Sequence, residues 1–207
     1  MFLIALFLLF QFNGCDGNSR LVRAIRDHSL KKVERLLNDG VDVNARVDGE
    51  QRTALMIAAL EKSPEITQLL INRGAEIGAT DKYGRTSLHY AARSGSCDSI
   101  KILVSYGAIV NPPAQPYHTA MMEAAGSGKA EAVKCLVELG AEVDRQDGGN
   151  STALMHAVWS HDFDTVKALL DAGADRSKRN NQGQTALEIA SRLENTEKIA
   201  SILSEYR

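Results

Sequence analysis

The chain has 207 residues, of which 44% are hydrophobic and 24% are charged, a composition typical of one or two globular domains. Its 24 Lys and Arg residues nearly balance its 26 Asp and Glu residues, so the net charge of −2 does not favour nucleic acid or an acidic membrane surface as a general partner. Three cysteines are too few for the disulfide framework of a small secreted scaffold, so we expect packing to hold the fold.

The segment 1–15 differs in composition from the rest of the chain. Residues 1–12 are apolar except for Gln11 and contain four of the five phenylalanines. This run is shorter than the roughly 20 residues of a membrane span, but it fits the apolar region of a secretory signal. Its end resembles a bacterial lipoprotein signal, in which a small residue (here Gly14) precedes a cysteine (here Cys15) that is lipidated and becomes the first residue.

Residues 1–15 are therefore predicted to be a leader, and we expect an exported protein of the periplasm or cell envelope with a lipid at Cys15. Phe12 and Asn13 depart from the usual lipoprotein pattern, and no Lys or Arg precedes the apolar run. Two alternatives stay open. The leader could be an ordinary signal peptide that releases a soluble secreted protein, or a misassigned start fused to a cytoplasmic protein.

An internal repeat with a period of about 33 residues organises the rest of the chain. A threonine that precedes a short helical segment recurs at this period, and it predicts a helix N-cap. A glycine that follows an apolar stripe recurs at nearly the same period, and it predicts a left-handed helix end. The threonines are Thr53, Thr86, Thr119, Thr152 and Thr185, and the glycines are Gly40, Gly74, Gly107, Gly140 and Gly173.

One unit is predicted to contain two helices and a reversing loop. Ile100, Leu103 and Val104 have the i, i+3, i+4 spacing of one apolar helix face, which predicts a second helix before each glycine. Residues 75–85 place Asp and Gly at turn spacing, which predicts an extended arm and a tight hairpin. Helices of about ten residues are marginal alone in water, so each unit must bury its apolar face against the next.

The run Asp81-x-x-Gly84-x-Thr86-x-Leu88-His89-x-Ala91-Ala92-x-x-Gly95 resembles the ankyrin repeat. The resemblance implies an all-α repeat solenoid of helix-turn-helix units joined by β-hairpin loops. The histidine of the family motif remains only at His89, so we expect its hydrogen bond to the next unit in that repeat alone. The resemblance covers residues 19–207, divided into an N-terminal cap (19–46), four repeats (48–80, 81–113, 114–146 and 147–179) and a C-terminal cap (180–207).

The sequence contains no motif that predicts catalysis, a cofactor or a metal site. The segment Gly126-Ser-Gly-Lys129 lacks the outer residues of a phosphate-binding loop and is interpreted as a turn between helices. His156 and His161 could suggest a metal cluster with Asp162 and Asp164. Their spacing, however, points the two histidines about 140° apart on a helix, so no metal ligand is predicted.

The two cysteines inside the repeats are expected to stay apart. Cys97 and Cys135 lie in neighbouring repeats but at different positions of the unit, so stacking is not expected to bring them together. Cys135 occupies the same position in its unit as Ile102 and Ala168, which predicts a small buried residue without a redox role.

The resemblance places partner contacts at hairpin tips and at exposed positions of the first helix of each unit. Aromatic residues and arginines are the usual anchors of an interface. Trp159, the only tryptophan, could instead cover the core. We expect Ala at Tyr90 and Trp159 to leave the fold largely intact and to abolish binding. The predicted partner-binding residues are Lys82, Tyr83, Arg85, Tyr90, Arg93, Tyr117, His118, Trp159 and Ser160.

These features predict a non-catalytic protein–protein interaction scaffold, a monomer that binds an envelope or secreted protein partner through a concave face. Neither nucleic acid nor a cofactor is expected, and the only expected membrane contact is the lipid at Cys15. A cytoplasmic or host-directed effector on the same scaffold is one alternative. An inhibitor or regulator of an enzyme is another, although the sequence shows no set of converging polar groups.

Overall fold

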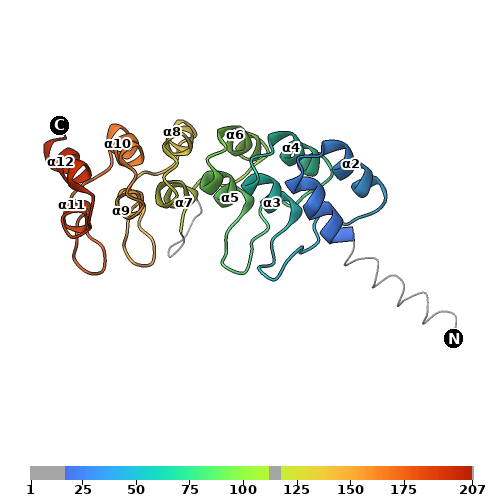
Figure 1. Cartoon of the computed structure of the whole chain (residues 1–207), viewed down its shortest axis with the longest axis horizontal. Coiled ribbons are helices and arrows are strands. Elements are labelled where there is room, and N and C mark those ends of the chain that lie inside the picture. The colour runs from blue at the N-terminus through green and yellow to red at the C-terminus, as the bar shows by residue number, and fades with distance from the viewer. Residues whose placement is uncertain (1–16, 112–117, 207) are drawn as a thin grey trace.

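The computed structural model describes residues 17–111 and 118–206, and the regular secondary structure of these residues is helical, without strands. The helices alternate between an inner and an outer row, and loops extend from the inner row on the side away from the outer one (Figure 1). A helix over residues 17–26 begins this arrangement. The units stack side by side into an elongated solenoid, which confirms the predicted fold class.

The inner row consists of α3 (Ala54–Leu60), α5 (Ser87–Ser94), α7 (Ala120–Gly126), α9 (Ala153–Trp159) and α11 (Ala186–Ala190). The outer row consists of α2 (Leu30–Asn38), α4 (Pro64–Asn72), α6 (Cys97–Ser105), α8 (Ala130–Glu138), α10 (Phe163–Asp171) and α12 (Glu197–Glu205). The inner helices are rich in buried alanine, for example Ala91 and Ala92, which lets neighbouring units pack closely.

The recurring threonine is the N-cap of every inner helix, as predicted. At Thr119, for example, the side-chain oxygen accepts a hydrogen bond from the Met122 N–H at 3.2 Å. The Thr86 N–H donates to His89 Nδ1 at 3.1 Å, so His89 Nε2 is left to donate to the His118 carbonyl oxygen of the next unit at 2.8 Å. The expected bond between units at His89 is therefore confirmed.

The recurring glycine ends the helices as predicted. Gly40, Gly74, Gly107, Gly140 and Gly173 have φ between 81° and 96°. This left-handed conformation costs little for glycine, because glycine lacks the Cβ atom that clashes with the backbone in other residues.

The reversing loops differ from the prediction, because the described ones contain no β-strands and only isolated bridges, Arg46 with Thr53 and Gln146 with Thr152. Each of these loops is instead closed by an Asp or Asn side chain within the loop, which accepts hydrogen bonds from the N–H groups two and four residues further on. The Asp81 carboxylate accepts hydrogen bonds from the Tyr83 and Arg85 N–H groups at 2.8 and 2.9 Å. These side-chain bonds satisfy backbone donors that a strand ladder would otherwise pair. Asp48, Asp147 and Asn180 close their loops in the same way.

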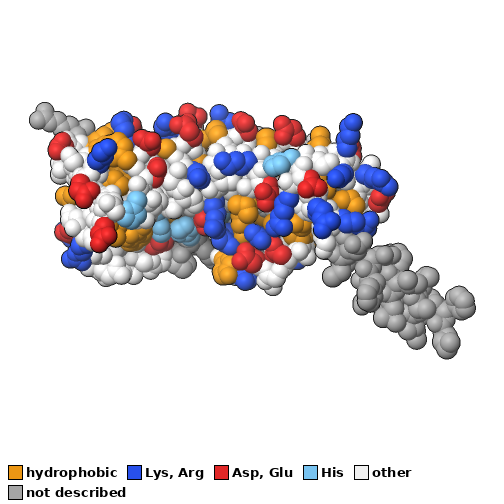
Figure 2. Space-filling view, in the orientation of Figure 1, with side chains coloured by type: hydrophobic (Ala, Val, Ile, Leu, Met, Phe, Trp, Pro, Cys, Tyr) orange, Lys and Arg blue, Asp and Glu red, His pale blue; other side chains and the backbone are white. Residues whose placement is uncertain are grey.

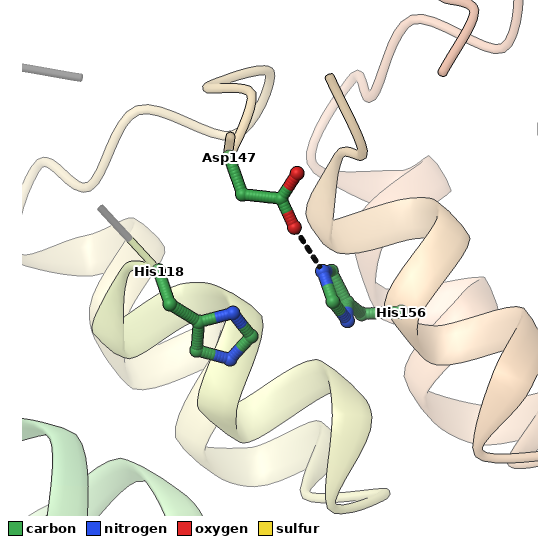
Figure 3. A group of neighbouring side chains, drawn as sticks. All are labelled: His118, Asp147 and His156. Atoms are coloured by element: carbon green, nitrogen blue, oxygen red, sulfur yellow. Dashed lines mark hydrogen bonds and ion pairs between the residues drawn. The ribbon is translucent and has the colours of Figure 1, made fainter. Parts of the chain in front are cut away.

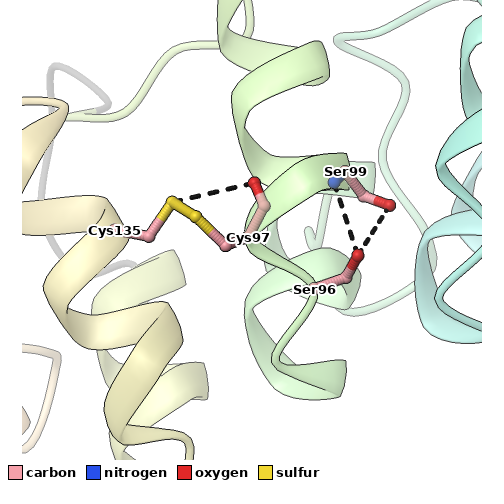
Figure 4. Close-up of a disulfide and its surroundings, with 4 residues drawn as sticks. All are labelled: Ser96, Cys97, Ser99 and Cys135. Carbon is pink, nitrogen blue, oxygen red and sulfur yellow. Dashed lines mark hydrogen bonds between the residues drawn. A yellow bond between two sulfur atoms is a disulfide. The ribbon is translucent and has the colours of Figure 1, made fainter.

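The expectation that Cys97 and Cys135 stay apart is wrong, because the structure joins them in a disulfide between α6 and α8 (Figure 4). Their Cα atoms lie 5.9 Å apart, an ordinary separation for a disulfide. The sequence argument considered only contacts between matching positions of neighbouring units, which lie one repeat period apart. Cys97 begins α6 and Cys135 lies in the last turns of α8, and the packing of these two outer helices nevertheless brings the two positions together. Packing alone therefore does not hold the fold, although Cys135 is buried as predicted.

No helix within residues 17–111 and 118–206 is long and apolar enough to cross a membrane.

Candidate binding surface

A hollow of about 720 Å³ lies between the loops and the inner helices, and its lining comes from the three repeats 48–80, 81–113 and 114–146. Lys and Arg side chains gather over the N-terminal half of the face shown in Figure 2, around hydrophobic and acidic side chains. We call this feature the tyrosine–arginine hollow. It is lined by Glu50, Arg52, Leu60, Tyr83, Arg85, Tyr90, Arg93, His118 and Glu123.

Tyr90 forms the floor of the hollow and belongs to the core, with 2% of its surface exposed. Its hydroxyl donates to Asp81 Oδ2 at 2.6 Å, and the Arg85 guanidinium lies 5.0 Å from the centre of its ring. Burial and the hydrogen bond to Asp81 raise the pKa of Tyr90 well above its ordinary value. Because this side chain fills the interior, we now expect Tyr90→Ala to destabilise the protein rather than to leave the fold largely intact.

The rim of the hollow is exposed and carries charge. Tyr83 is 61% exposed, and its ring lies 4.7 Å from the Arg85 guanidinium and 4.8 Å from the Lys82 ammonium. Arg85 also pairs with Asp81 at 2.8 Å. Burial lowers the pKa of Arg85, but the bond to Asp81 outweighs burial, so the pKa is raised overall. These cation–π contacts hold the exposed ring of Tyr83 in place at the rim.

The far side of the hollow is formed by Arg93, His118 and Glu123. Burial raises the pKa of Glu123, although the positive charge of Arg93 opposes this shift. His118 Nε2 lies 3.7 Å from Glu123 Oε1. Burial, followed by the charge of His156, lowers the pKa of His118 to about 4. At neutral pH this end of the hollow therefore presents an uncharged imidazole beside a carboxyl group.

Beyond the hollow, three side chains come together that we call the histidine cluster: His118, Asp147 and His156 (Figure 3). His156 Nε2 donates to Asp147 Oδ2 at 2.9 Å. Burial raises the pKa of Asp147, but the hydrogen bonds from His156 and the loop N–H groups outweigh it, so the pKa is lowered overall. The rings of His118 and His156 meet edge to face, with centroids 4.8 Å apart.

Trp159 extends this row of rings. Its ring stacks edge to face on His156 at a centroid distance of 5.2 Å, and 39% of its surface is exposed. Trp159 thus packs on His156 and keeps an exposed face, and its role in binding a partner stays a prediction. Ser160 is half-buried and donates to the Ala157 carbonyl oxygen at 2.8 Å.

The structure therefore gathers most of the predicted contact residues on one face. Tyr83, Arg85, Tyr90, Arg93 and His118 line one hollow. Lys82 lies beside the exposed ring of Tyr83, and Trp159 continues from His118 through His156. Tyr117 lies outside the described residues.

The histidine pair considered from sequence spacing is not a cluster. His161 lies in the turn after α9 with a φ of 58°, and Asp162 caps α10 by accepting from the Thr165 N–H at 2.8 Å. The histidine that does meet His156 is His118, from the preceding unit.

The predicted contact residues did not include Glu50, Arg52, Leu60 and Glu123 of the hollow, and sequence reasoning missed Asp147 of the histidine cluster. The repeat register could have found the first two, because they lie one period before Tyr83 and Arg85. Asp147 is the fourth-repeat equivalent of Asp81, so the pairing of Asp81 with Tyr90 corresponds to that of Asp147 with His156.

The model of the family described as ankyrin repeats (three copies) matches residues 21–114 and 121–207. The chain belongs to the ankyrin-repeat family. Ankyrin-repeat domains are generally non-catalytic modules that bind proteins, so membership supports a protein-interaction scaffold.

Several curated proteins are similar to short parts of this ankyrin-repeat chain. It is 34% identical over 69 residues to the serine/threonine-protein kinase 12 of Arabidopsis thaliana, a match that covers 33% of this chain and 15% of the kinase. It is 36% identical over 66 residues to the mitochondrial disaggregase of Bos taurus and 34% identical over 68 residues to that of Homo sapiens. These two matches cover 32% and 33% of this chain and 10% of each disaggregase. The chain therefore spans a small fraction of the length of these relatives.

Proposed function

We propose that this ankyrin-repeat protein is a non-catalytic scaffold that is exported, tethered to a membrane by a lipid at Cys15, and bound to an envelope or secreted protein. The tyrosine–arginine hollow is the binding surface. The single observation that carries this proposal is the exposed Tyr83 ring, held between Lys82 and Arg85 at the rim of that hollow.

The chemistry of the hollow is that of a protein interface. Interfaces are enriched in tyrosine, tryptophan and arginine because these side chains bury a large area and also form polar contacts. Arg52 and Arg85 are held in place by Asp48 and Asp81 at 2.7 and 2.8 Å, so little freedom is lost in ordering them against a partner. Glu50 and Glu123 leave the hollow mixed in charge, which favours a partner that carries both signs.

The disulfide supports export. Disulfides persist in oxidising compartments such as the periplasm and the extracellular space, and they are rare in the cytosol. Cys97 and Cys135 pair with each other, so Cys15 is the odd cysteine of the chain. Cys15 lies outside the described residues, and its place at the end of an apolar leader fits a lipid acceptor.

Site-specific photo-crosslinking in the native cells tests the binding surface. A photoreactive amino acid replaces Tyr83 or Trp159, and the matched control replaces Tyr106, an exposed tyrosine at the end of outer helix α6. We expect the Tyr83 and Trp159 positions to give adducts with the same protein and the Tyr106 position to give none. Adding Arg93→Glu should abolish the Tyr83 adduct. Equal adducts from all three positions, or none from Tyr83 and Trp159, would overturn the assignment.

The mass of the mature N-terminus tests export and tethering, with Cys15→Ala as the control. A diacylglycerol-modified Cys15 supports a tethered envelope protein. An unmodified start after residue 15 indicates a soluble secreted protein and overturns tethering. Retention of Met1 with free thiols at Cys97 and Cys135 in rapidly alkylated cells overturns export and leaves a cytoplasmic or host-directed effector.

A further inference from the structure

The histidine cluster brings together ligand types that bind metal ions. One donor atom from each of His118, Asp147 and His156 lies within 4.8 Å of the others. His118 is the residue before the Thr119 cap of α7, Asp147 opens the next loop, and His156 lies on α9 (Figure 3). All three side chains are partly exposed, so an ion can reach them from solvent.

Part of this cluster has a structural counterpart elsewhere in the solenoid. Asp81 closes its loop through Oδ1 and receives the Tyr90 hydroxyl on Oδ2, as Asp147 closes its loop through Oδ1 and receives His156 on Oδ2. The loop contacts thus fix the carboxylate and leave Oδ2 directed at the inner helix. Where the second repeat has the phenol of Tyr90, the fourth has the imidazole of His156. The pair in the fourth repeat therefore consists of two groups that can each bind a metal ion.

His118 is not required for the hydrogen bond between His156 and Asp147. Its ring nitrogens make no hydrogen bond to any residue in 17–111 or 118–206, and Glu123 Oε1 stands 3.7 Å from its Nε2. Its side chain is 37% exposed and has two rotatable torsions, through which the ring nitrogens can be directed toward the His156–Asp147 pair. Within the described part of the chain, the ring nitrogens of His118 are therefore available to a metal ion beside the fixed His156–Asp147 pair.

We propose that His118, Asp147 and His156 bind one divalent transition-metal ion of the zinc class. Two imidazoles with one carboxylate suit Zn²⁺, whose bonds to such donors are about 2.0–2.2 Å. Tetrahedral donors then lie about 3.3 Å apart. His156 Nε2 and Asp147 Oδ2 are already 2.9 Å apart, and rotation of His118 closes the longer separation. Water or Glu123 completes the coordination.

The ion would link two repeats, because His118 belongs to the unit before that of Asp147 and His156. Its position beside the tyrosine–arginine hollow, which His118 also lines, would let it order one end of the binding face. The metal proposal stands independently of the proposed partner and of export.

Trp159 supplies a direct readout, since it is the only tryptophan and its ring lies 5.2 Å from that of His156. Full-length protein, purified without a histidine tag and stripped with EDTA, is titrated with ZnCl₂ while Trp159 fluorescence and heat are recorded. We expect both signals to saturate at one equivalent. Co²⁺ in place of Zn²⁺ should give the visible absorption of a four-coordinate site.

Single substitutions assign the ligands. His118→Ala and Asp147→Asn should weaken Zn²⁺ binding by more than about tenfold, since even partners outside the coordination shell contribute that much. The matched control is His161→Ala, an exposed histidine in the turn beyond Trp159, which should bind as the wild type does. Circular dichroism in EDTA checks the fold, and His118→Ala keeps the test decisive because its ring makes no described hydrogen bond. No saturable binding, or equal affinity in His118→Ala and wild type, would refute the site.

Discussion

Removing the disulfide between Cys97 and Cys135 should destabilise the protein strongly. The bridge joins residues 38 apart in sequence, so it closes a long loop in the unfolded chain. The loop-closure relation gives about 4 kcal/mol at 25 °C for a loop of this length. For a chain of this size, each kcal/mol corresponds to about 2–4 °C in Tm, so the expected loss is roughly 8–16 °C.

Guanidinium chloride unfolding with and without a phosphine reductant measures this loss. Oxidised and reduced wild-type protein have the same side chains, so no cavity contributes to the difference in their unfolding free energies. The double variant Cys97→Ala/Cys135→Ala should match the reduced wild type and should not respond to reductant. Cys15→Ala controls for the remaining thiol and should behave as the wild type.

Two results would refute this reasoning. A thiol titration of the folded, unreduced protein that finds Cys97 and Cys135 free would show that the bond does not form. An unchanged unfolding midpoint after complete reduction would show that the outer helices α6 and α8 restrain the chain without it, as their direct packing would allow.

Three further outcomes test the packing of the repeats. Gly140→Ala should cost about 1–2 kcal/mol, because φ is 81° and an added Cβ meets nothing within 4 Å, so only the left-handed backbone contributes; chemical denaturation measures it. Tyr90→Ala should lower the unfolding free energy by about 3–5 kcal/mol, and Tyr90→Phe by about 1.5–3 kcal/mol through the lost bond to Asp81; a smaller effect of Tyr90→Ala than of Tyr90→Phe would contradict its burial. Burial raises the pKa of Asp81, but bonds from Tyr90 and Arg85 outweigh it and hold the pKa below its ordinary value. Its stabilising effect is therefore complete above the unfolded pKa and is lost as pH falls through the folded one. Asp81→Asn keeps the loop contacts, as Asn180 does naturally, and should flatten the loss of Tm between about pH 5 and 2.

The two helices of each unit and their ends could be predicted from the residues alone. A threonine caps a helix and a glycine ends one through contacts within a few residues of itself, so Thr119 and Gly140 determine their local conformation wherever the unit lies. The repeat period then dictates stacking, because no unit can bury its apolar face alone.

The contacts between units could be identified only from the tertiary structure. Cys97 meets Cys135 and His118 meets His156, and both pairs have the same separation of 38 in sequence, one unit plus five positions. The packing of neighbouring units brings these positions together, and a comparison of matching positions in the sequence does not predict it. Tyr90 shows the same limit: Ile57 and Ile189 hold its position in other units and are buried, yet only the packed neighbours decide that the tyrosine ring is enclosed as well. The sequence by itself therefore determined the repeat and the helices within it, with their N-caps and their glycine ends. The disulfide, the floor of the hollow and the histidine cluster were decided by how one repeat sits against the next, because such contacts depend on distances between helices that no residue within a single unit specifies.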